Sequence, residues 1–380
     1  MSKTRTIGVI GAYGQTGVVV VSELLKRTDC TLLIGGRDAQ KVHHLVQVMG
    51  ERVIGKVIDI NDKKTLSEFC ASCAIVLNCA GPSYSVLDKV AQAAKEHGCH
   101  YVDPGGYDYV LEKIQADQTE IADKNLSFLL SAGWMPGLLE IFPMYVEVSA
   151  AQYFDQLNSL DIYYGDPSAW STVGALDQVD LIQRYSHKST GIFSYGEWKP
   201  KSLLSAAPTV VLPQPLGKQR VFLQALPEIK QFAAQRDFYQ RIGSYVGLVS
   251  TSTLLTSLYI KLFMKDKPLP AARRLQAAYK NDFERSQRIG GFIVATIDGF
   301  KDQQPHRVVG TLLEKMHYWI TGLVPAIAVE MLLNEKITKR GCYYLHEVVD
   351  PQYFMSELFK AGVRYDIQTS ATTPTQVSVV

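Results

Sequence analysis

The stretch that decides the fold is TIGVIGAYGQTGVVVVSELLKR, from Thr6 to Arg27. A short apolar strand pattern leads into the glycine-rich turn GAYGQTG (residues 11–17), and an apolar helical pattern follows it. Glycines at this spacing permit a tight turn, a close approach of the backbone to a pyrophosphate, and close packing of helix on strand. The start of the helix adds amide donors and the positive end of its dipole. We therefore predict a dinucleotide-binding turn with these three roles at Gly11, Gly14 and Gly17.

Working outward, short β-rich runs alternate with helical patterns from residue 6 to residue 131. This alternation predicts an N-terminal Rossmann domain, in which a doubly wound parallel sheet carries helices on both faces. The rhythm changes after Gly133, and the runs at 156–168 and 290–314 have the pattern of strands in a mixed or antiparallel sheet. The fold class that we predict is α/β, with a second α+β domain.

These patterns divide the chain into four parts. We expect a Rossmann domain at 1–137, a substrate-binding and dimerisation domain at 138–320, C-terminal helices that pack back on the Rossmann domain at 321–365, and a disordered tail at 366–380. Gly322 and Pro325 interrupt the apolar pattern from 318 to 336, so we expect that helix to begin at Pro325.

Composition narrows the classes of function. A formal net charge of +2 provides no long-range field for nucleic acid, so we predict no nucleic-acid partner. The chain begins without a signal-peptide pattern and has six cysteines, which is typical of a cytoplasmic protein. Cys70 and Cys73 lack a second pair at zinc spacing, so we predict no metal site.

The segment 246–264 is apolar but contains too many hydroxyl groups for a membrane span. We expect a buried or lid helix and disfavour membrane contact. The alternative is an interfacial helix, with Tyr259, Phe263 and the flanking lysines at a bilayer surface.

The end of the second predicted strand indicates the cofactor. NAD enzymes place an acidic residue there for the ribose hydroxyl, whereas this chain has Gly35-Gly36-Arg37-Asp38. A guanidinium suits a 2′-phosphate, so Arg37 favours NADP. Asp38 argues mildly for NAD, although it can equally cap the next helix.

Other residues follow the predicted strands at the carboxyl edge, where such sheets bind ligands. Asp59 is placed to meet the adenine edge; the alternative is a helix cap at Asp59 or Asn61. The run NCAGP should lie near the nicotinamide. The cofactor-binding residues that we predict are Gly11, Tyr13, Gly14, Gln15, Thr16, Gly17, Arg37, Asp38, Asp59, Ile60, Asn78, Ala80, Gly81 and Pro82.

Three residues at the same edge are candidates for the acid that donates a proton, or for positioning it: Tyr84, Asp103 and Tyr107. A phenol can donate a proton at neutral pH, but an aspartic acid with an ordinary pKa cannot. The substrate-binding residues that we predict are Ser83, Trp134, Met135, Tyr163 and Trp170. The large side chains in this set can equally fill the core where the two domains join.

Five pieces of sequence carry a family resemblance: GAYGQTG with GGRD, NCAGP, HYVD with a glycine turn, SAGWMPGL at 131–138, and the C-terminal run from GLVPAIAVEMLL to KAGV. By these the chain resembles the saccharopine dehydrogenase-like family. The resemblance implies a nicotinamide reductase that acts on C=N or C=C bonds. Members that handle amino acids carry an acidic residue before the Pro-Gly pair, and Met135 stands there, which weakens recognition of an α-amine.

The function that we expect is therefore transfer of hydride from NADPH to an imine or thiazoline-like C=N group. The expected partner is a small-molecule or carrier-protein-bound substrate, and the expected assembly is a homodimer. One alternative is an enoyl reductase that acts in trans on polyketide or lipid-type chains. Another is a non-catalytic sensor or scaffold that binds NADP.

Overall fold

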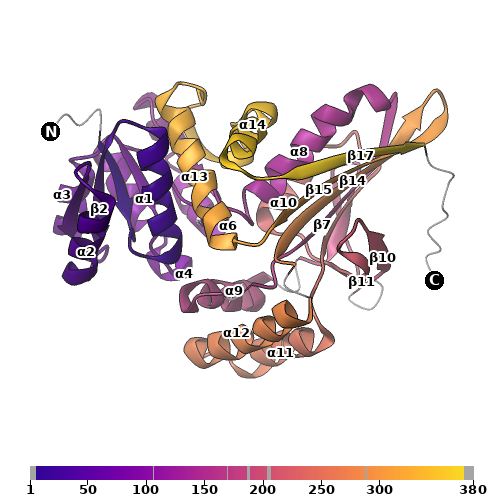
Figure 1. Ribbon diagram of the computed structural model, residues 1–380, viewed down its shortest axis with the longest axis horizontal. Coiled ribbons are helices and arrows are strands. Elements are labelled where there is room, and N and C mark those ends of the chain that lie inside the picture. The colour runs from indigo at the N-terminus through magenta and orange to yellow at the C-terminus, as the bar shows by residue number, and fades with distance from the viewer. Residues whose placement is uncertain are drawn as a thin grey trace. The chain divides into compact units, whose positions relative to one another are not determined.

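A computed structural model describes residues 6–105, 107–168, 170–185, 189–202, 207–286 and 289–371. The chain forms two compact units (Figure 1). Unit 1 comprises Met1–Leu138 and His317–Leu358, and unit 2 comprises Leu139–Met316 and Phe359–Val380.

Unit 1 is built on a seven-stranded sheet in which every pair is parallel, in the order β16-β6-β5-β4-β1-β2-β3. Its strands are β1 (Thr6–Ile10), β2 (Thr31–Gly36), β3 (Val53–Val57), β4 (Ile75–Asn78), β5 (His100–Val102), β6 (Ser127–Leu130) and β16 (Gly341–Tyr344). Its helices are α1 (Gln15–Arg27), α2 (Ala39–Met49), α3 (Lys63–Cys70), α4 (Ser83–Val86), α5 (Lys89–Glu96), α6 (Tyr107–Gln115), α7 (Gln118–Asp123), α13 (His317–Leu333) and α14 (Pro351–Ala361).

The parallel sheet confirms the predicted Rossmann-type fold. Strands β1, β4 and β6 are buried along their whole length, as expected for a sheet with helices on both faces. The chain runs from β1 to β2 and β3 on one side, and then returns to β4 on the other side of β1. The carboxyl ends of β1 and β4 therefore flank the point where the strand order reverses, which is where sheets of this kind bind ligands.

The C-terminal helix α13 packs on α1. A Cβ at Gly322 would lie 2.7 Å from the Val19 side chain, so the absence of a side chain there permits the close approach. Helix α13 runs without a break through Pro325, and our expectation that it begins at Pro325 is wrong. Arg27 of α1 contacts Glu330 of α13 at 2.9 Å and Glu357 of α14 at 3.6 Å, which ties both helices to the first part of the chain.

Unit 2 contains an eight-stranded mixed sheet in the order β17-β15-β14-β7-β13-β8-β9, with β12 paired to β13. Strands β7 and β13 are parallel and their neighbours are antiparallel, which confirms the predicted mixed sheet. The strands are β7 (Gln156–Gly165), β8 (Gly191–Ser194), β9 (Glu197–Pro200), β12 (Phe222–Leu223), β13 (Arg241–Val246), β14 (Gly291–Lys301), β15 (Gln304–Glu314) and β17 (Tyr365–Ala371), besides the hairpin of β10 (Thr209–Leu212) and β11 (Gly217–Arg220). The helices are α8 (Leu138–Ala150), α9 (Thr172–Tyr185), α10 (Pro227–Ala234), α11 (Thr251–Phe263) and α12 (Pro268–Arg285).

Strand β17 corrects the expected disordered tail. Residues 365–371 pair with β15 along the edge of the sheet, because alternate side chains of the run YDIQTSA suit an edge strand. The rest of that tail, 372–380, lies outside the described residues.

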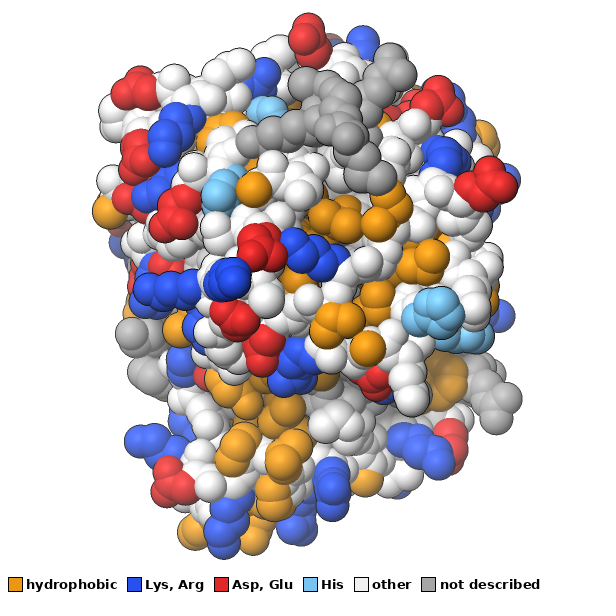
Figure 2. Space-filling view, turned by 90° about the vertical axis from the view of Figure 1, so that its left-hand side faces the viewer, with side chains coloured by type: hydrophobic (Ala, Val, Ile, Leu, Met, Phe, Trp, Pro, Cys, Tyr) orange, Lys and Arg blue, Asp and Glu red, His pale blue; other side chains and the backbone are white. Residues whose placement is uncertain are grey.

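Of the buried or lid helix that we expected at 246–264, the structure contradicts the buried form, because α11 is largely exposed. Only Thr253 and Ile260 are buried among its residues. Figure 2 shows hydrophobic side chains gathered at the lower end of its view, where Figure 1 draws α9, α11 and α12. Over the part of the chain that the structure describes, no helix is long and apolar enough to cross a bilayer.

Candidate dinucleotide-binding site

The glycine-rich turn lies between β1 and α1 and has the geometry of a phosphate-binding loop. Gly11 has φ +76°, and a Cβ there would lie 2.7 Å from the amide nitrogen of Ala80 in the loop after β4. A Cβ at Gly17 would overlap the backbone of Gly11 and Ala12. At Gly14, by contrast, the added atom would meet only the carbonyl oxygen of Gly11, at 3.2 Å. Gly11 and Gly17 are thus required by the fold, whereas Gly14 leaves open space beside the backbone.

The N-terminus of α1 offers free amide donors next to this space. The first bond of the helix runs from the amide of Val18 to the carbonyl of Gly14, at 2.9 Å. The three amides before it, at residues 15–17, therefore have no acceptor within the helix. Gly14 is the N-cap and makes no side-chain cap. Amides and the helix dipole together suit a diphosphate at this point.

The end of β2 separates the roles of Arg37 and Asp38. Asp38 is the N-cap of α2, and its Oδ1 accepts from the amides of Gln40 at 3.0 Å and Lys41 at 3.1 Å. The carboxylate is therefore engaged in the protein, which removes the argument for NAD. Arg37 is exposed, and none of the ion pairs found among the described side chains involves it.

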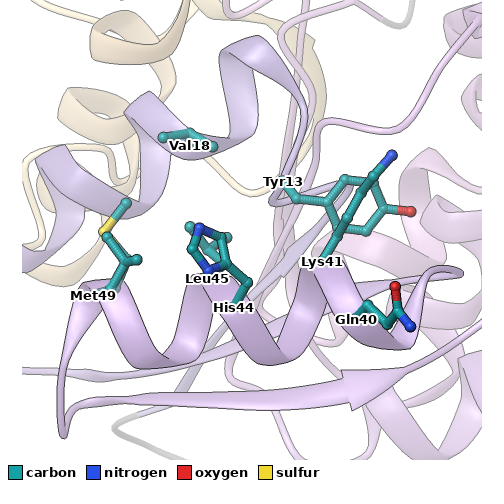
Figure 3. A pocket seen from close by; sticks show the side chains of 8 residues that line it. Tyr13, Val18, Gln40, Lys41, His44, Leu45 and Met49 are labelled. Atoms are coloured by element: carbon teal, nitrogen blue, oxygen red, sulfur yellow. The ribbon is translucent and has the colours of Figure 1, made fainter.

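Sequence reasoning missed Lys41, which lies beside Tyr13 (Figure 3). The Lys41 Nζ is 5.6 Å from the centre of the Tyr13 ring and 3.7 Å from Asp38. The Tyr13 hydroxyl accepts from the amide of Asp38 at 3.3 Å, and its ring covers Gly36. The signal that could have found Lys41 is its place in the first turn of the helix that Asp38 caps. Two cations, Arg37 and Lys41, thus stand near the end of β2.

A pocket of about 500 Å³ lies between α1 and α2, and Tyr13 and Lys41 form part of its wall. It is lined mainly by apolar side chains, including Val18, Leu45 and Met49 (Figure 3). The free amides of α1 and the Arg37 side chain are not part of its wall. This groove is therefore distinct from the crevice at the carboxyl ends of β1 and β4.

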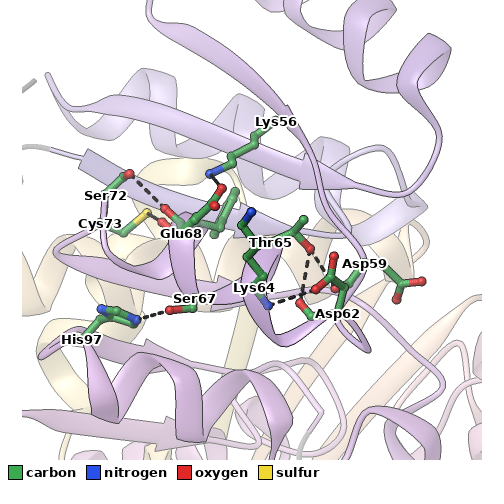
Figure 4. Close-up of polar contacts among 11 residues, drawn as sticks. Lys56, Asp59, Asp62, Lys64, Thr65, Ser67, Glu68, Ser72, Cys73 and His97 are labelled. Atoms are coloured by element: carbon green, nitrogen blue, oxygen red, sulfur yellow. Dashed lines mark hydrogen bonds and ion pairs between the residues drawn. The ribbon is translucent and has the colours of Figure 1, made fainter.

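Asp59 closes a turn after β3 (Figure 4). Its Oδ1 accepts from the backbone amide of Asn61 at 2.9 Å and from the Asn61 side chain at 3.1 Å. The N-cap of α3 is Asp62, whose carboxylate accepts from the amide of Lys64 at 3.0 Å. The helix cap that we considered at Asp59 or Asn61 therefore lies at the residue after Asn61. Ile60 is partly buried against the core of unit 1.

A buried hydrogen-bond network joins the ends of β4 and β5. The Asp103 carboxylate accepts from the Asn78 amide at 3.1 Å, the Tyr101 hydroxyl at 2.6 Å and the backbone amide of Gly105 at 2.9 Å. The Asn78 Oδ1 in turn accepts from the amide of Ala80 at 3.2 Å. Both ends of the Asn78 side chain are therefore used to hold the loop, and this favours a positioning role over cofactor contact.

Burial dominates the electrostatics of this network. It raises the pKa of Asp103 above the ordinary value, although the three donors oppose the shift. Burial and the nearby Asp103 raise the pKa of Tyr101 and that of the Cys79 thiol. Asp103 receives hydrogen bonds from all three partners and so acts as an acceptor, which favours positioning over proton donation.

The other two candidates for the acid begin short helices at the same edge. Tyr84 is in α4, directly after the loop that Asn78 holds, and it is partly buried. Tyr107 is the first residue of α6, and its side chain lies outside the described residues.

The predicted substrate residues fall in both units. Ser83, Trp134 and Met135 belong to unit 1, and Tyr163 and Trp170 to unit 2. Trp134 is buried, and its indole N–H has no acceptor among the described atoms. Tyr163 stacks on Tyr245 with ring centres 5.1 Å apart and belongs to an apolar cluster under the sheet, so it is a core residue. Trp170 stacks on Tyr279 at 4.1 Å.

Among the residues that the structure describes, no cluster of three or more His, Cys, Asp or Glu side chains could hold a metal ion.

Comparison with known proteins finds similarity in the N-terminal part of unit 1. Residues 7–128 match the saccharopine dehydrogenase NADP binding domain, in agreement with the predicted cofactor. A probable mitochondrial saccharopine dehydrogenase-like oxidoreductase of Arabidopsis thaliana is 27% identical over 137 residues, which cover 33% of this chain and 30% of that protein. The match thus spans less than a third of the plant protein.

Two solved structures share the whole fold. Apo saccharopine dehydrogenase (L-Glu forming) of Saccharomyces cerevisiae has a TM-score of 0.67 and 14% identity, over 97% of this chain and 100% of that one. A probable dehydrogenase of Thermotoga maritima has a TM-score of 0.50 and 11% identity, over 95% and 98%. Because the sequence identities are only 14% and 11%, the similarity to these two structures shows a shared fold and nothing about function.

Proposed function

We propose that the chain is an NADPH-dependent oxidoreductase of the saccharopine dehydrogenase-like family, because residues 7–128 match the NADP binding domain of saccharopine dehydrogenase. We further propose that it reduces a C=N group, imine or thiazoline-like, of a small-molecule or carrier-bound intermediate.

The cofactor part of the proposal rests on the glycine-rich turn. Free amides at the start of α1 and the open space at Gly14 fit a diphosphate. Arg37 and Lys41 supply two cations for a 2′-phosphate, while Asp38 is held as a helix cap. When bound, NADPH supplies the hydride; the protein holds and orients both reactants.

The preference for C=N over C=C rests on one observation, the buried carboxylate of Asp103 at the carboxyl edge of the sheet. Reduction of a protonated imine starts from a cation, and a carboxylate nearby stabilises that cation. Reduction of an enoyl group develops negative charge on oxygen, and the same carboxylate opposes it. The charge of Asp103 therefore favours the imine.

Trp134 supplies a second supporting feature. An unpartnered buried donor costs about 1–3 kcal/mol in a folded protein, so an acceptor on a ligand gains from meeting it. We propose that the indole N–H donates to the substrate, and that the Tyr84 hydroxyl protonates the imine nitrogen before hydride transfer. This proton transfer forms the cation that Asp103 stabilises, and it leaves Tyr84 as the phenolate. A phenol suits this step because it can donate at neutral pH.

We also propose a homodimer in a reducing compartment such as the cytosol. Strands β9 and β17 are the edges of the sheet in unit 2, and edge strands present unpaired groups that suit pairing with a second copy. All six cysteines lie in the described part of the chain and none of them forms a disulfide there, in keeping with a reducing environment.

The test is a substrate panel with the full chain and NADPH, containing cyclic imines, thiazolines and enoyl thioesters. The proposal expects loss of NADPH absorbance and a product two hydrogens heavier with the C=N substrates alone. Reduction of the enoyl thioesters only would replace it with the enoyl alternative. Stoichiometric NADPH binding without turnover on any substrate would favour the sensor or scaffold.

Two variants assign roles within that assay. Tyr84→Phe should bind NADPH as the wild type does and lose most of its turnover. Asp103→Asn replaces one acceptor oxygen by an NH₂ group that faces the hydrogen-bond donors of the network. The folding of this variant is therefore checked first by thermal melting. If both variants fold and turn over C=N substrates normally, neither residue has the role proposed here.

A further inference from the structure

The surface formed by α11 and the start of α12 combines exposed apolar side chains with positive charge. Five residues of α11 that are large and apolar are 42–68% exposed. They are Leu255, Leu258, Tyr259, Leu262 and Phe263, and we call them the apolar stripe. Their spacing of three and four residues places them on one face of the helix, from its second turn to its end. Leu269, in the first turn of α12, is also exposed, at 52%.

The stripe is not covered by the rest of unit 2. Helix α11 buries only Thr253 and Ile260, which lie on its opposite side. Isolated exposed leucines are ordinary on protein surfaces, but a continuous row of them over one helix marks a site of association. Figure 2 shows such a gathering of hydrophobic side chains at its lower end, with Lys and Arg side chains around it.

Positive charge is concentrated in the same hairpin. Residues 251–285 contain seven Lys and Arg against three Asp and Glu, whereas the whole chain has a formal net charge of only +2. Lys265 and Lys267 are exposed just after the end of α11, and Arg273 and Arg274 are exposed in the second turn of α12. The Arg274 guanidinium lies 4.5 Å from the centre of the Tyr259 ring, so charge and apolar surface meet directly.

Several hydroxyl groups of α11 form hydrogen bonds within the helix or with its cap residue. Thr256 donates to the carbonyl of Ser252 at 2.8 Å, and Ser257 donates to the carbonyl of Thr253 at 3.0 Å. The cap residue Ser250 accepts from the amide of Thr253 at 3.2 Å. Because these groups do not depend on water, the helix can leave water on one side at little cost.

We propose that α11 and the first turns of α12 form a docking surface for an anionic lipid bilayer. The stripe enters the boundary between headgroups and acyl chains, with the helix parallel to the membrane. The basic residues at its end face the phosphates, and the Tyr259 ring lies at headgroup level. Charge complementarity selects this occupant over a second copy of the chain, because two copies of so basic a hairpin repel each other. Helix α11 has 13 residues, so it lies on the bilayer and does not cross it.

The test is co-sedimentation of the full chain with vesicles of phosphatidylcholine, with or without about one-third phosphatidylglycerol. Binding is expected on the anionic vesicles and should weaken as salt rises, because salt screens the charges. Leu262→Ser with Phe263→Ser should weaken partitioning at least tenfold. Lys265→Glu with Lys267→Glu should weaken it by about fivefold or more for each cation removed.

Matched controls come from the β10–β11 hairpin. Val211 is 80% exposed and apolar, and Lys218 is exposed and basic, so Val211→Ser and Lys218→Glu make the same chemical changes outside the surface. Both controls should bind vesicles as the wild type does, and all variants should keep the wild-type affinity for NADPH and melting temperature.

Three outcomes would overturn the proposal. The first is absence of wild-type binding to anionic vesicles. The second is equal binding by the wild type and the Leu262→Ser, Phe263→Ser variant. The third is a wild-type dimer that this variant dissociates in light scattering without vesicles, which would make the stripe a subunit interface.

Discussion

Substituting two glycines of the same turn should separate cofactor binding from folding. Gly14 has φ −72° and ψ 165°, an extended conformation open to any residue. A methyl group at Gly14 would touch only the Gly11 carbonyl oxygen, at 3.2 Å. The loss of glycine as N-cap and the lower entropy of the unfolded chain oppose each other, so the free energy of unfolding of Gly14→Ala should stay within about 1 kcal/mol of wild type.

The affinity of Gly14→Ala for the cofactor should change much more than its free energy of unfolding. The same methyl group projects into the space where the backbone must approach the diphosphate, so the dissociation constant for NADPH should rise at least about tenfold, or 1.4 kcal/mol. In Gly17→Ala the new Cβ overlaps the Gly11 and Ala12 backbone instead. Overpacking of this kind costs about 1–3 kcal/mol, which lowers the melting temperature by about 2–4 °C per kcal/mol in a unit of this size.

The assay is calorimetric titration with NADPH beside thermal melting, for the wild type and both variants. The expected pattern is normal melting with weak binding for Gly14→Ala, and low melting for Gly17→Ala. A folded Gly14→Ala protein that binds NADPH as tightly as the wild type would refute the reasoning, because the turn would then not hold the diphosphate.

Three further changes test other parts of the structure. Arg37→Ala should weaken NADPH about 10- to 100-fold and leave NADH within about twofold, as measured by titration, because one charge-assisted contact to the 2′-phosphate is lost. Burial and the nearby Arg340 lower the pKa of His100 from 6.5 to about 4. Between pH 6.5 and pH 4 the unfolded chain therefore binds more protons than the folded protein does. The free energy of unfolding should fall by up to about 3 kcal/mol as the pH drops from 7 to 4. His100→Gln should flatten this slope in urea unfolding at several pH values, and an unchanged slope would contradict the assignment. Asp161→Ala removes a carboxylate that contacts Arg241 twice, at 2.7 and 2.6 Å, and should cost about 3 kcal/mol in denaturant unfolding; a loss below about 1 kcal/mol would show that solvent replaces the pair.

The features of unit 1 that were predictable from sequence are those set by the backbone. A glycine turn between strand and helix is a local pattern, and so is a cap residue before a helix. Local sequence patterns did not predict the elements whose formation depends on contacts with distant parts of the chain. Strand β16 has only the four residues GCYY, and it forms because β6 offers a free edge more than two hundred residues earlier in the chain. Helix α13 tolerates Pro325 because packing on α1 holds it.

Side chains in unit 2 were harder to interpret because their chemistry does not reveal what they contact. Tyr163 and Trp170 have the same aromatic character in sequence, and both find their ring partners far away, at Tyr245 and Tyr279. Neither partner has a local signal.

The same reasoning explains why the sequence left α11 open between a buried helix, a lid helix and an interfacial helix. Its leucines and hydroxyl residues have the average hydrophobicity of a buried helix, and average hydrophobicity does not indicate on which side a helix is covered. What distinguishes α11 is that its buried face is nearly empty of large apolar residues, while its exposed face holds five. A helix that only supports a core orients its apolar residues in the opposite way, since burial of those residues is what stabilises it. The inverted arrangement is therefore maintained at a cost in stability, and a surface that binds something apolar accounts for that cost.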